Sequence, residues 1–180
     1  DNDLVLATHG RSIMIMDDIT PLQQLTPTVL ASDAHLFEPR NAVRWKQDIR
    51  QRRAVTGQMN WEGENAPEGT SIAYYLKNAP GGNVTITIRE VGDTAVFRRI
   101  TGTKLAGVNQ VRWDLCSDVR PAPQQGGFGG GGGGGCAEGQ GRDRRVGRMA
   151  EPGAYSVTLS VGGREFARSV SVLEDIWMNP

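Results

Sequence analysis

The chain has 180 residues, of which 38% are hydrophobic, and its twenty Lys and Arg residues balance twenty Asp and Glu residues. This length fits one domain with an extension, and a formal charge of zero gives no general attraction to nucleic acid or anionic membranes. The apolar runs are far shorter than the ~20 residues of a membrane-spanning helix. We therefore expect no nucleic-acid partner and no transmembrane segment, although docking onto a membrane complex stays compatible with this composition.

Residues 1–25 contain two short apolar runs, at 4–8 and 13–16, around the turn His9-Gly10. This pattern predicts a β-hairpin. Because a lone two-stranded hairpin is marginal in water, we expect both strands to contact something outside the rest of the chain, and we interpret the chain as the tail of a larger protein. A one-turn helix is predicted next, with Thr20 as N-cap and Pro21 in the first helical position.

Residues 26–69 are predicted to be a linker that contains one short strand at 34–37. The segment holds Pro27, Pro39 and a polar, Arg-rich stretch from residue 44 to 53. The basic run at 50–53 has the composition of a phosphate contact, but the neutral balance of the whole chain favours a solvated loop.

A ladder of strands is predicted from residue 70 to the C-terminus. Short segments rich in Val, Ile, Thr and Tyr alternate with Gly and Pro turns, at 70–76, 84–90, 95–100, 107–115, 153–161 and 164–173. Gly162-Gly163 between two apolar runs is typical of a tight hairpin turn. In the segment 107–115 we expect Val108, Val111 and Trp113 to be buried. The fold class is therefore all-β, with an immunoglobulin- or fibronectin-III-like sandwich over residues 70–180.

Cys116 and Cys136 flank a glycine-rich insertion, which we place at 124–141. The two cysteines belong to no CxxC motif and both histidines are distant in sequence, which argues against zinc. One interpretation is a disulfide that closes the glycine-rich loop, worth ~3 kcal/mol by chain entropy. The other is a pair of unpaired thiols in a reducing cytosol.

The glycine tract satisfies a GxGxxG pattern trivially, but no GK[ST] follows it, so it does not predict a phosphate-binding loop. Glycine permits close backbone approach, and we predict that the tract contacts another protein chain. The candidate partner-binding residues are Phe128 in the tract, the arginines Arg142, Arg144 and Arg145 after it, and Trp177 near the C-terminus.

Three groups of polar residues have the composition of a catalytic or metal site. Glu62, Glu64 and Glu68 near Trp61 resemble an acid pair beside a sugar platform, but their Asn, Pro and Gly neighbours favour a conformational role. Asp17, Asp18 and Asp33 lack the ligand spacing of a calcium loop. His9 has no nucleophile motif to accompany it. We therefore predict no catalytic residue, no cofactor and no metal ligand.

Several longer strings resemble the C-terminal part of sortilin-like propeller proteins, which carry bacterial-neuraminidase-type repeats. They are DLVLATHGRSIMIMDDITPLQQL, HLFEPR, NWEGENAPEGTSIAYYLK, GVNQVRWDL and EPGAYSVTLSVGG. The resemblance implies that the first string forms the closing strands of a β-propeller and that a β-sandwich follows it. The propeller itself is missing here, and the glycine tract with its cysteines departs from the family pattern.

The expected function is that of a non-catalytic structural or protein-binding module in an exported protein, periplasmic or secreted. Its expected protein partner is the propeller, or the subunits of a larger extracytoplasmic complex. The alternative is the C-terminal fragment of a propeller glycoside hydrolase whose active site lies upstream.

Overall fold

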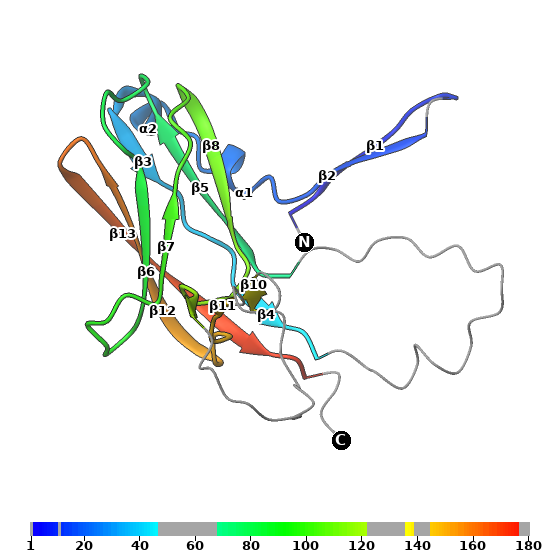
Figure 1. Cartoon of the computed structure of the whole chain (residues 1–180). Coiled ribbons are helices and arrows are strands. Elements are labelled where there is room, and N and C mark those ends of the chain that lie inside the picture. The colour runs from blue at the N-terminus through cyan, green and yellow to red at the C-terminus, as the bar shows by residue number, and fades with distance from the viewer. Residues whose placement is uncertain (1, 11, 47–67, 122–135, 139–144, 177–180) are drawn as a thin grey trace, which may run out of the picture.

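The computed structural model describes residues 2–10, 12–46, 68–121, 136–138 and 145–176. Their architecture is all-β, as the sequence predicts: a two-sheet sandwich, a separate N-terminal hairpin and a small sheet at one end (Figure 1). The elements are β1 (Leu4–Ala7), β2 (Ile13–Met16), α1 (Thr20–Gln23), α2 (Pro27–Ala31), β3 (Ala34–Leu36), β4 (Ala42–Arg44), β5 (Thr70–Leu76), β6 (Thr85–Glu90), β7 (Arg98–Thr101), β8 (Gly107–Trp113), β9 (Arg120–Pro121), β10 (Ala137–Glu138), β11 (Arg145–Val146), β12 (Gly153–Val161) and β13 (Arg164–Glu174).

The sandwich consists of a five-stranded sheet, β4-β13-β12-β6-β7, and a three-stranded sheet, β3-β5-β8. Within the larger sheet, the order of β13, β12, β6 and β7 matches the G-F-C-C′ order of immunoglobulin-type sandwiches. The chain enters through the smaller sheet at β3 and then crosses to the larger one, where β4 runs parallel to β13. The second sandwich strand, β4, therefore pairs with the last one, β13.

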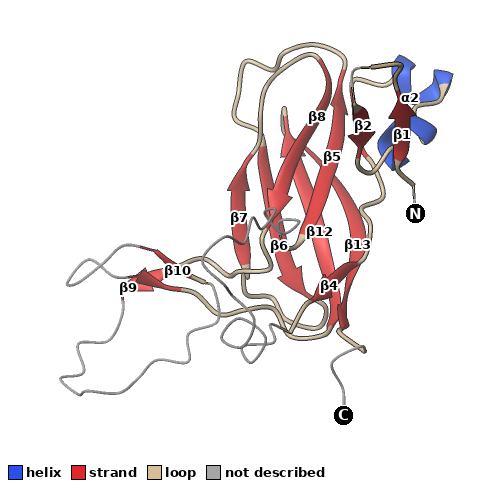
Figure 2. Cartoon of the chain, turned by 90° about the vertical axis from the view of Figure 1, so that its right-hand side faces the viewer, coloured by secondary structure: helices blue, strands red, loops and turns tan. Residues whose placement is uncertain are grey.

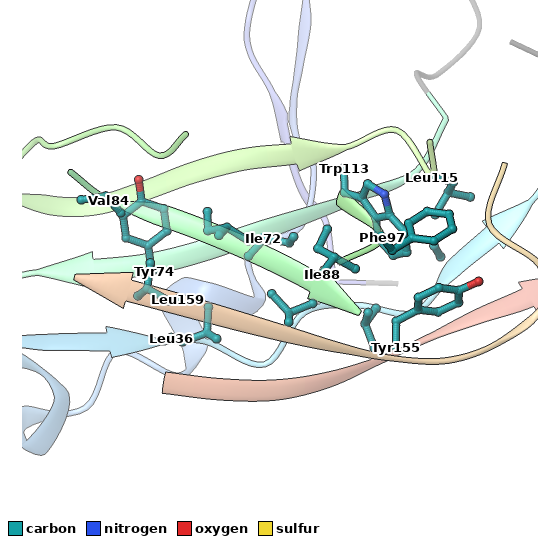
Figure 3. Close-up of a cluster of buried hydrophobic side chains, with 14 of the residues drawn as sticks. Leu36, Ile72, Tyr74, Val84, Ile88, Phe97, Trp113, Leu115, Tyr155 and Leu159 are labelled. Atoms are coloured by element: carbon teal, nitrogen blue, oxygen red, sulfur yellow. The ribbon is translucent and has the colours of Figure 1, made fainter. Parts of the chain in front are cut away.

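Alternating strand residues fill the space between the two sheets. Along β12, residues Tyr155, Val157, Leu159 and Val161 point inward and are buried, while the residues between them are half-buried. Figure 3 shows Tyr155 and Leu159 among side chains of the smaller sheet, with the rings of Phe97, Trp113 and Tyr155 gathered at one end of the core. The three rings contact one another edge to face, with centroids 5.2 to 6.0 Å apart.

Strand β8 differs from the predicted burial pattern. Trp113 is fully buried and Val111 packs against the core, but Val108 is 42% exposed. Asn109 is buried in its place because its side chain is fully engaged. Its Oδ1 accepts from the Thr103 hydroxyl and the Leu105 N–H, and its Nδ2 donates to two backbone carbonyls. A polar side chain that makes all its hydrogen bonds can replace a hydrophobic one inside a sheet.

The segment predicted as a linker contributes more to the fold than expected. Besides the expected strand β3, its described part contains helix α2, capped by the Thr26 hydroxyl, and strand β4. The predicted strand at 95–100 is shorter, because β7 begins only at Arg98. The N-cap prediction at Thr20 is wrong: Ile19 occupies that position, and Thr20 is the first helical residue. The carboxylate of Asp18 accepts the Thr20 N–H instead, at 3.3 Å.

Candidate functional site

The hairpin of β1 and β2 stands apart from the sandwich, connected to it through its base and the two short helices (Figures 1 and 2). Its register pairs Leu4 with Met16, Val5 with Ile15, Leu6 with Met14 and Ala7 with Ile13. Directly opposed residues share a face of an antiparallel pair, and successive residues alternate between faces. One face of the hairpin therefore carries Leu4, Leu6, Met14 and Met16, and the other carries Val5, Ala7, Ile13 and Ile15.

Both hairpin faces are apolar and both are open to solvent. The seven large side chains of the two strands are between 42% and 63% exposed. A sheet with one face on a core shows apolar and polar residues in alternation, whereas strands buried on both faces read as continuous apolar runs. The hairpin has the second pattern without the burial that normally goes with it.

The apolar part of the hairpin has polar residues at both ends. At the tip, the Thr8 N–H and hydroxyl both donate to the Ser12 carbonyl, and Gly10 and Ser12 have positive φ. At the base lie Asp3, Asp17 and Asp18. The apolar part is four residues long on each strand, or about 13 Å at the usual rise of a β-strand.

A second feature is a hollow of about 780 Å³ at the end of the sandwich that holds the aromatic rings. It lies between the segment 90–97, which joins β6 to β7, and the two segments 117–118 and 146–148. Phe97 forms part of its wall, and the Arg148 guanidinium lies 5.1 Å from the centre of that ring. Arg148 also lies 3.5 Å from the Glu90 carboxylate.

The carboxylates around this hollow have local structural partners. Asp93 accepts the Ala95 N–H at 2.9 Å, and Asp118 accepts the Arg99 N–H at 3.1 Å. The first bond lies within the turn after β6, and the second joins β7 to the segment that follows β8. Sequence reasoning did not identify this hollow, because Phe97 and Arg148 are distant in the chain and no local motif connects them.

The predicted disulfide between Cys116 and Cys136 is confirmed, and both cysteines are buried. It joins the segment after β8 to the start of the small sheet β10-β11-β9, which Figure 2 shows at the end of the sandwich away from the hairpin. Backbone bonds support the link: Gly147 donates to the Cys136 carbonyl at 2.7 Å, and Cys116 forms a β-bridge with Met149. The segments 117–118 and 146–148, which adjoin this disulfide, therefore form one wall of the hollow.

Only one of the predicted partner-binding residues, Arg145, lies within the described part of the chain. Phe128, Arg142, Arg144 and Trp177 lie outside the described residues, as do Trp61, Glu62 and Glu64. Arg145 lies in β11, where its backbone pairs with Glu138 and Pro121. Of the two described tryptophans, Trp45 is 54% exposed and Trp113 is in the core.

The acidic residues weighed as calcium ligands are separated. Asp33 pairs with Arg164 at 2.8 Å, whereas Asp17 and Asp18 lie at the hairpin base. Among the described residues, no group of three or more His, Cys, Asp or Glu side chains has the arrangement of a metal site. Glu68 accepts hydrogen bonds from Arg112 through its backbone carbonyl, which is a conformational role.

Three groups have shifted pKa values, each with a structural cause. Burial lowers the pKa of His35 below 6.5, and the positive charge of Arg168 lowers it further. Burial raises the pKa of Tyr74 and of Tyr155 above 10.0. The Tyr74 hydroxyl donates to the Thr103 carbonyl and the Tyr155 hydroxyl to the Glu151 carbonyl. These shifts reflect packing within the sandwich.

Within the described ranges, no helix is both long and apolar enough to span a bilayer. The sequence matches no family model, and neither the curated proteins nor the solved structures contain a significant match to it.

Proposed function

We propose that the chain is a non-catalytic structural module that binds protein through the hairpin β1–β2. The observation that carries this proposal is the exposure of seven large apolar side chains on the two faces of a sheet that consists of β1 and β2 alone. Burying a Leu, Ile or Met side chain completely is worth roughly 1.5–3 kcal/mol, and these are about half exposed. Covering all seven would therefore favour association, against the entropic cost of bringing the partners together.

The two-faced pattern favours a partner that covers both sides of the hairpin. In a dimer of this chain, the two hairpins could pack face to face, but the outer face of each hairpin would stay exposed to water. In a β-propeller, the sheets of successive blades stand around a central channel, so each blade lies between two neighbours. The hairpin would there form two strands of a blade, as the resemblance to sortilin-like propeller proteins implies, with its polar tip at the surface.

The confirmed disulfide supports an exported location, periplasmic or secreted, because disulfides persist in oxidising compartments and are rare in the cytosol. The sandwich would then be an extracytoplasmic domain beside the propeller, or beside the subunits of a larger assembly.

Intact-mass and size measurements on the protein purified from its natural source test this proposal. We expect the species that contains this chain to include an additional β-rich body, in the same polypeptide or as a stoichiometric subunit. A natural species that is only the monomeric 180-residue chain would contradict the proposal. Turnover of glycans by the purified species would favour the alternative, a propeller glycoside hydrolase.

A further inference from the structure

The base of the hairpin is tied to the chain that follows it by side-chain and backbone hydrogen bonds. The Asp3 Oδ1 atom accepts the Asp18 N–H at 3.0 Å, across the two ends of the hairpin. The same oxygen lies 3.6 Å from the Arg40 guanidinium, which belongs to the segment between β3 and β4 of the sandwich. Asp3 therefore links both ends of the hairpin to the domain.

A second set of bonds joins the start of the hairpin to helix α1. The Asn2 carbonyl accepts the Ile19 N–H at 2.7 Å, and the Asn2 side-chain amide donates to the Thr20 hydroxyl at 3.0 Å. Asp18, with φ +56°, turns the chain from β2 into this contact. The hairpin and the first turn of α1 are thus held together on two sides.

Helix α1 is in turn held by the sandwich. The Gln24 side chain makes a two-point contact with the backbone of Glu38: its Oε1 accepts the N–H at 3.0 Å and its Nε2 donates to the carbonyl at 3.5 Å. Glu38 follows Phe37, which is 1% exposed and whose N–H donates to Ala73 on β5. The contact therefore reaches a rigid part of the smaller sheet.

The sequence of the connection supports a stiff junction. Residues 11–56 contain no glycine, and the connection between β2 and β3 includes Pro21 and Pro27. Flexible linkers are rich in Gly and Ser, whereas proline restricts the backbone. Pro21 is also buried. Both side-chain contacts and backbone chemistry thus restrict movement between the hairpin and the sandwich.

We infer that Asp3 and Gln24 are positioning residues, which hold the hairpin at a fixed angle to the sandwich. The hairpin and the small disulfide-linked sheet leave opposite ends of the sandwich (Figures 1 and 2). A fixed angle means that whatever binds the hairpin also sets the direction in which the hollow beside Phe97 and Arg148 faces. The inference concerns the free chain and does not depend on the identity of the hairpin's partner.

Distances between spin labels on the hairpin and on the sandwich test the inference. The described cysteines are both in the disulfide, so labels can be placed with His9→Cys at the hairpin tip and Ser169→Cys on β13. We expect a single narrow distance distribution for the otherwise unchanged 180-residue chain. Replacing both positioning residues, Asp3→Ala with Gln24→Ala, should abolish that narrow peak while circular dichroism still reports the β-sandwich.

The matched control is Asp17→Ala with Gln23→Ala, which removes the same two residue types from neighbouring exposed positions. This control should keep the narrow peak, and Asp3→Asn, which retains an acceptor for the Asp18 N–H, should keep more of it than Asp3→Ala does. A broad distribution in the unchanged chain, or a narrow one in the Asp3→Ala/Gln24→Ala variant, would overturn the inference. Neither result bears on whether the hairpin binds a protein.

Discussion

Trp113 of β8 and Tyr155 of β12 contact each other across the two sheets, with ring centroids 5.2 Å apart and ring planes at 61°. Both rings also contact Phe97 edge to face. The Trp113 indole N–H donates to the Cys116 carbonyl at 3.2 Å. This one pair of rings therefore joins the core of the sandwich to the segment that carries the disulfide and lines the hollow.

Truncating Trp113 should strongly destabilise the sandwich. Trp113→Ala removes a fully buried indole and leaves a cavity, so we expect a loss of about 3–5 kcal/mol in the free energy of unfolding. Tyr155→Phe is the milder comparison, because it keeps the ring and removes only the hydroxyl bond to Glu151, worth about 0.5–1.5 kcal/mol. Urea unfolding followed by circular dichroism measures both. Equal losses would show that the ring contact is not a main support of the core.

Removal of the disulfide should cost about 3 kcal/mol of unfolding free energy, because the bridge closes a loop between cysteines 20 positions apart. The comparison is between the unchanged chain and the Cys116→Ala/Cys136→Ala variant in urea. Because both cysteines are buried, we also expect the bridge to resist reductant until denaturant is added. Mass mapping that finds both thiols freely alkylated in the native protein would contradict the account of the bridge and of the exported location.

His35 should make stability depend on pH near neutrality. Its pKa in the folded protein lies below 6.5, so as the pH falls through that value the unfolded chain takes up a proton before the folded one does. The free energy of unfolding should therefore be fully present above about pH 7 and fall as the pH is lowered through about 6.

Urea unfolding between about pH 5.5 and pH 7.5 measures this dependence. His35→Gln should flatten it, because the substitution removes the imidazole whose pKa is lowered by burial and by Arg168. A free energy of unfolding that stays constant over this range in the unchanged chain would contradict the lowering of the His35 pKa by burial and by Arg168.

The two sides of the hairpin can be tested separately in the protein purified from its natural source. Leu6→Thr weakens one face and Ile15→Thr the other, and threonine preserves the preference for a strand. If the hairpin lies between two sheets of a partner, both variants should lower the denaturant concentration at which half of the hairpin has separated from that partner. Thr8→Ser at the hairpin tip should leave this midpoint unchanged. Sensitivity of one face only would indicate a partner that covers a single side.

The hairpins were predictable because their signals are local. Gly162-Gly163 joins β12 to β13 with both glycines at positive φ, and the turn at His9-Gly10 joins β1 to β2. Strand β4 was not predicted: it has only three residues, and it pairs with β13 about 130 positions later. The burial of Asn109 depends on bonds to Thr103 and Leu105, which a period-two pattern does not represent.

The features of the candidate site also differ in whether local sequence predicts them. The apolar hairpin and the cysteine pair follow from residues close in sequence or of one rare type. The hollow forms where the packing of separate loops brings Arg148 against Phe97. The hydrogen bonds that hold the base of the hairpin depend on single side chains such as Gln24. Neither arrangement leaves a repeating pattern in the sequence.

Amide hydrogen exchange of β1 and β2 shows whether the hairpin is covered by a partner in the natural species. It compares the isolated 180-residue chain with the protein in the species purified from its natural source. We expect the hairpin amides to exchange more slowly in the natural species than in the isolated chain, with little change in β12. Equally rapid exchange of the hairpin in both would contradict the claim that the hairpin is the binding element.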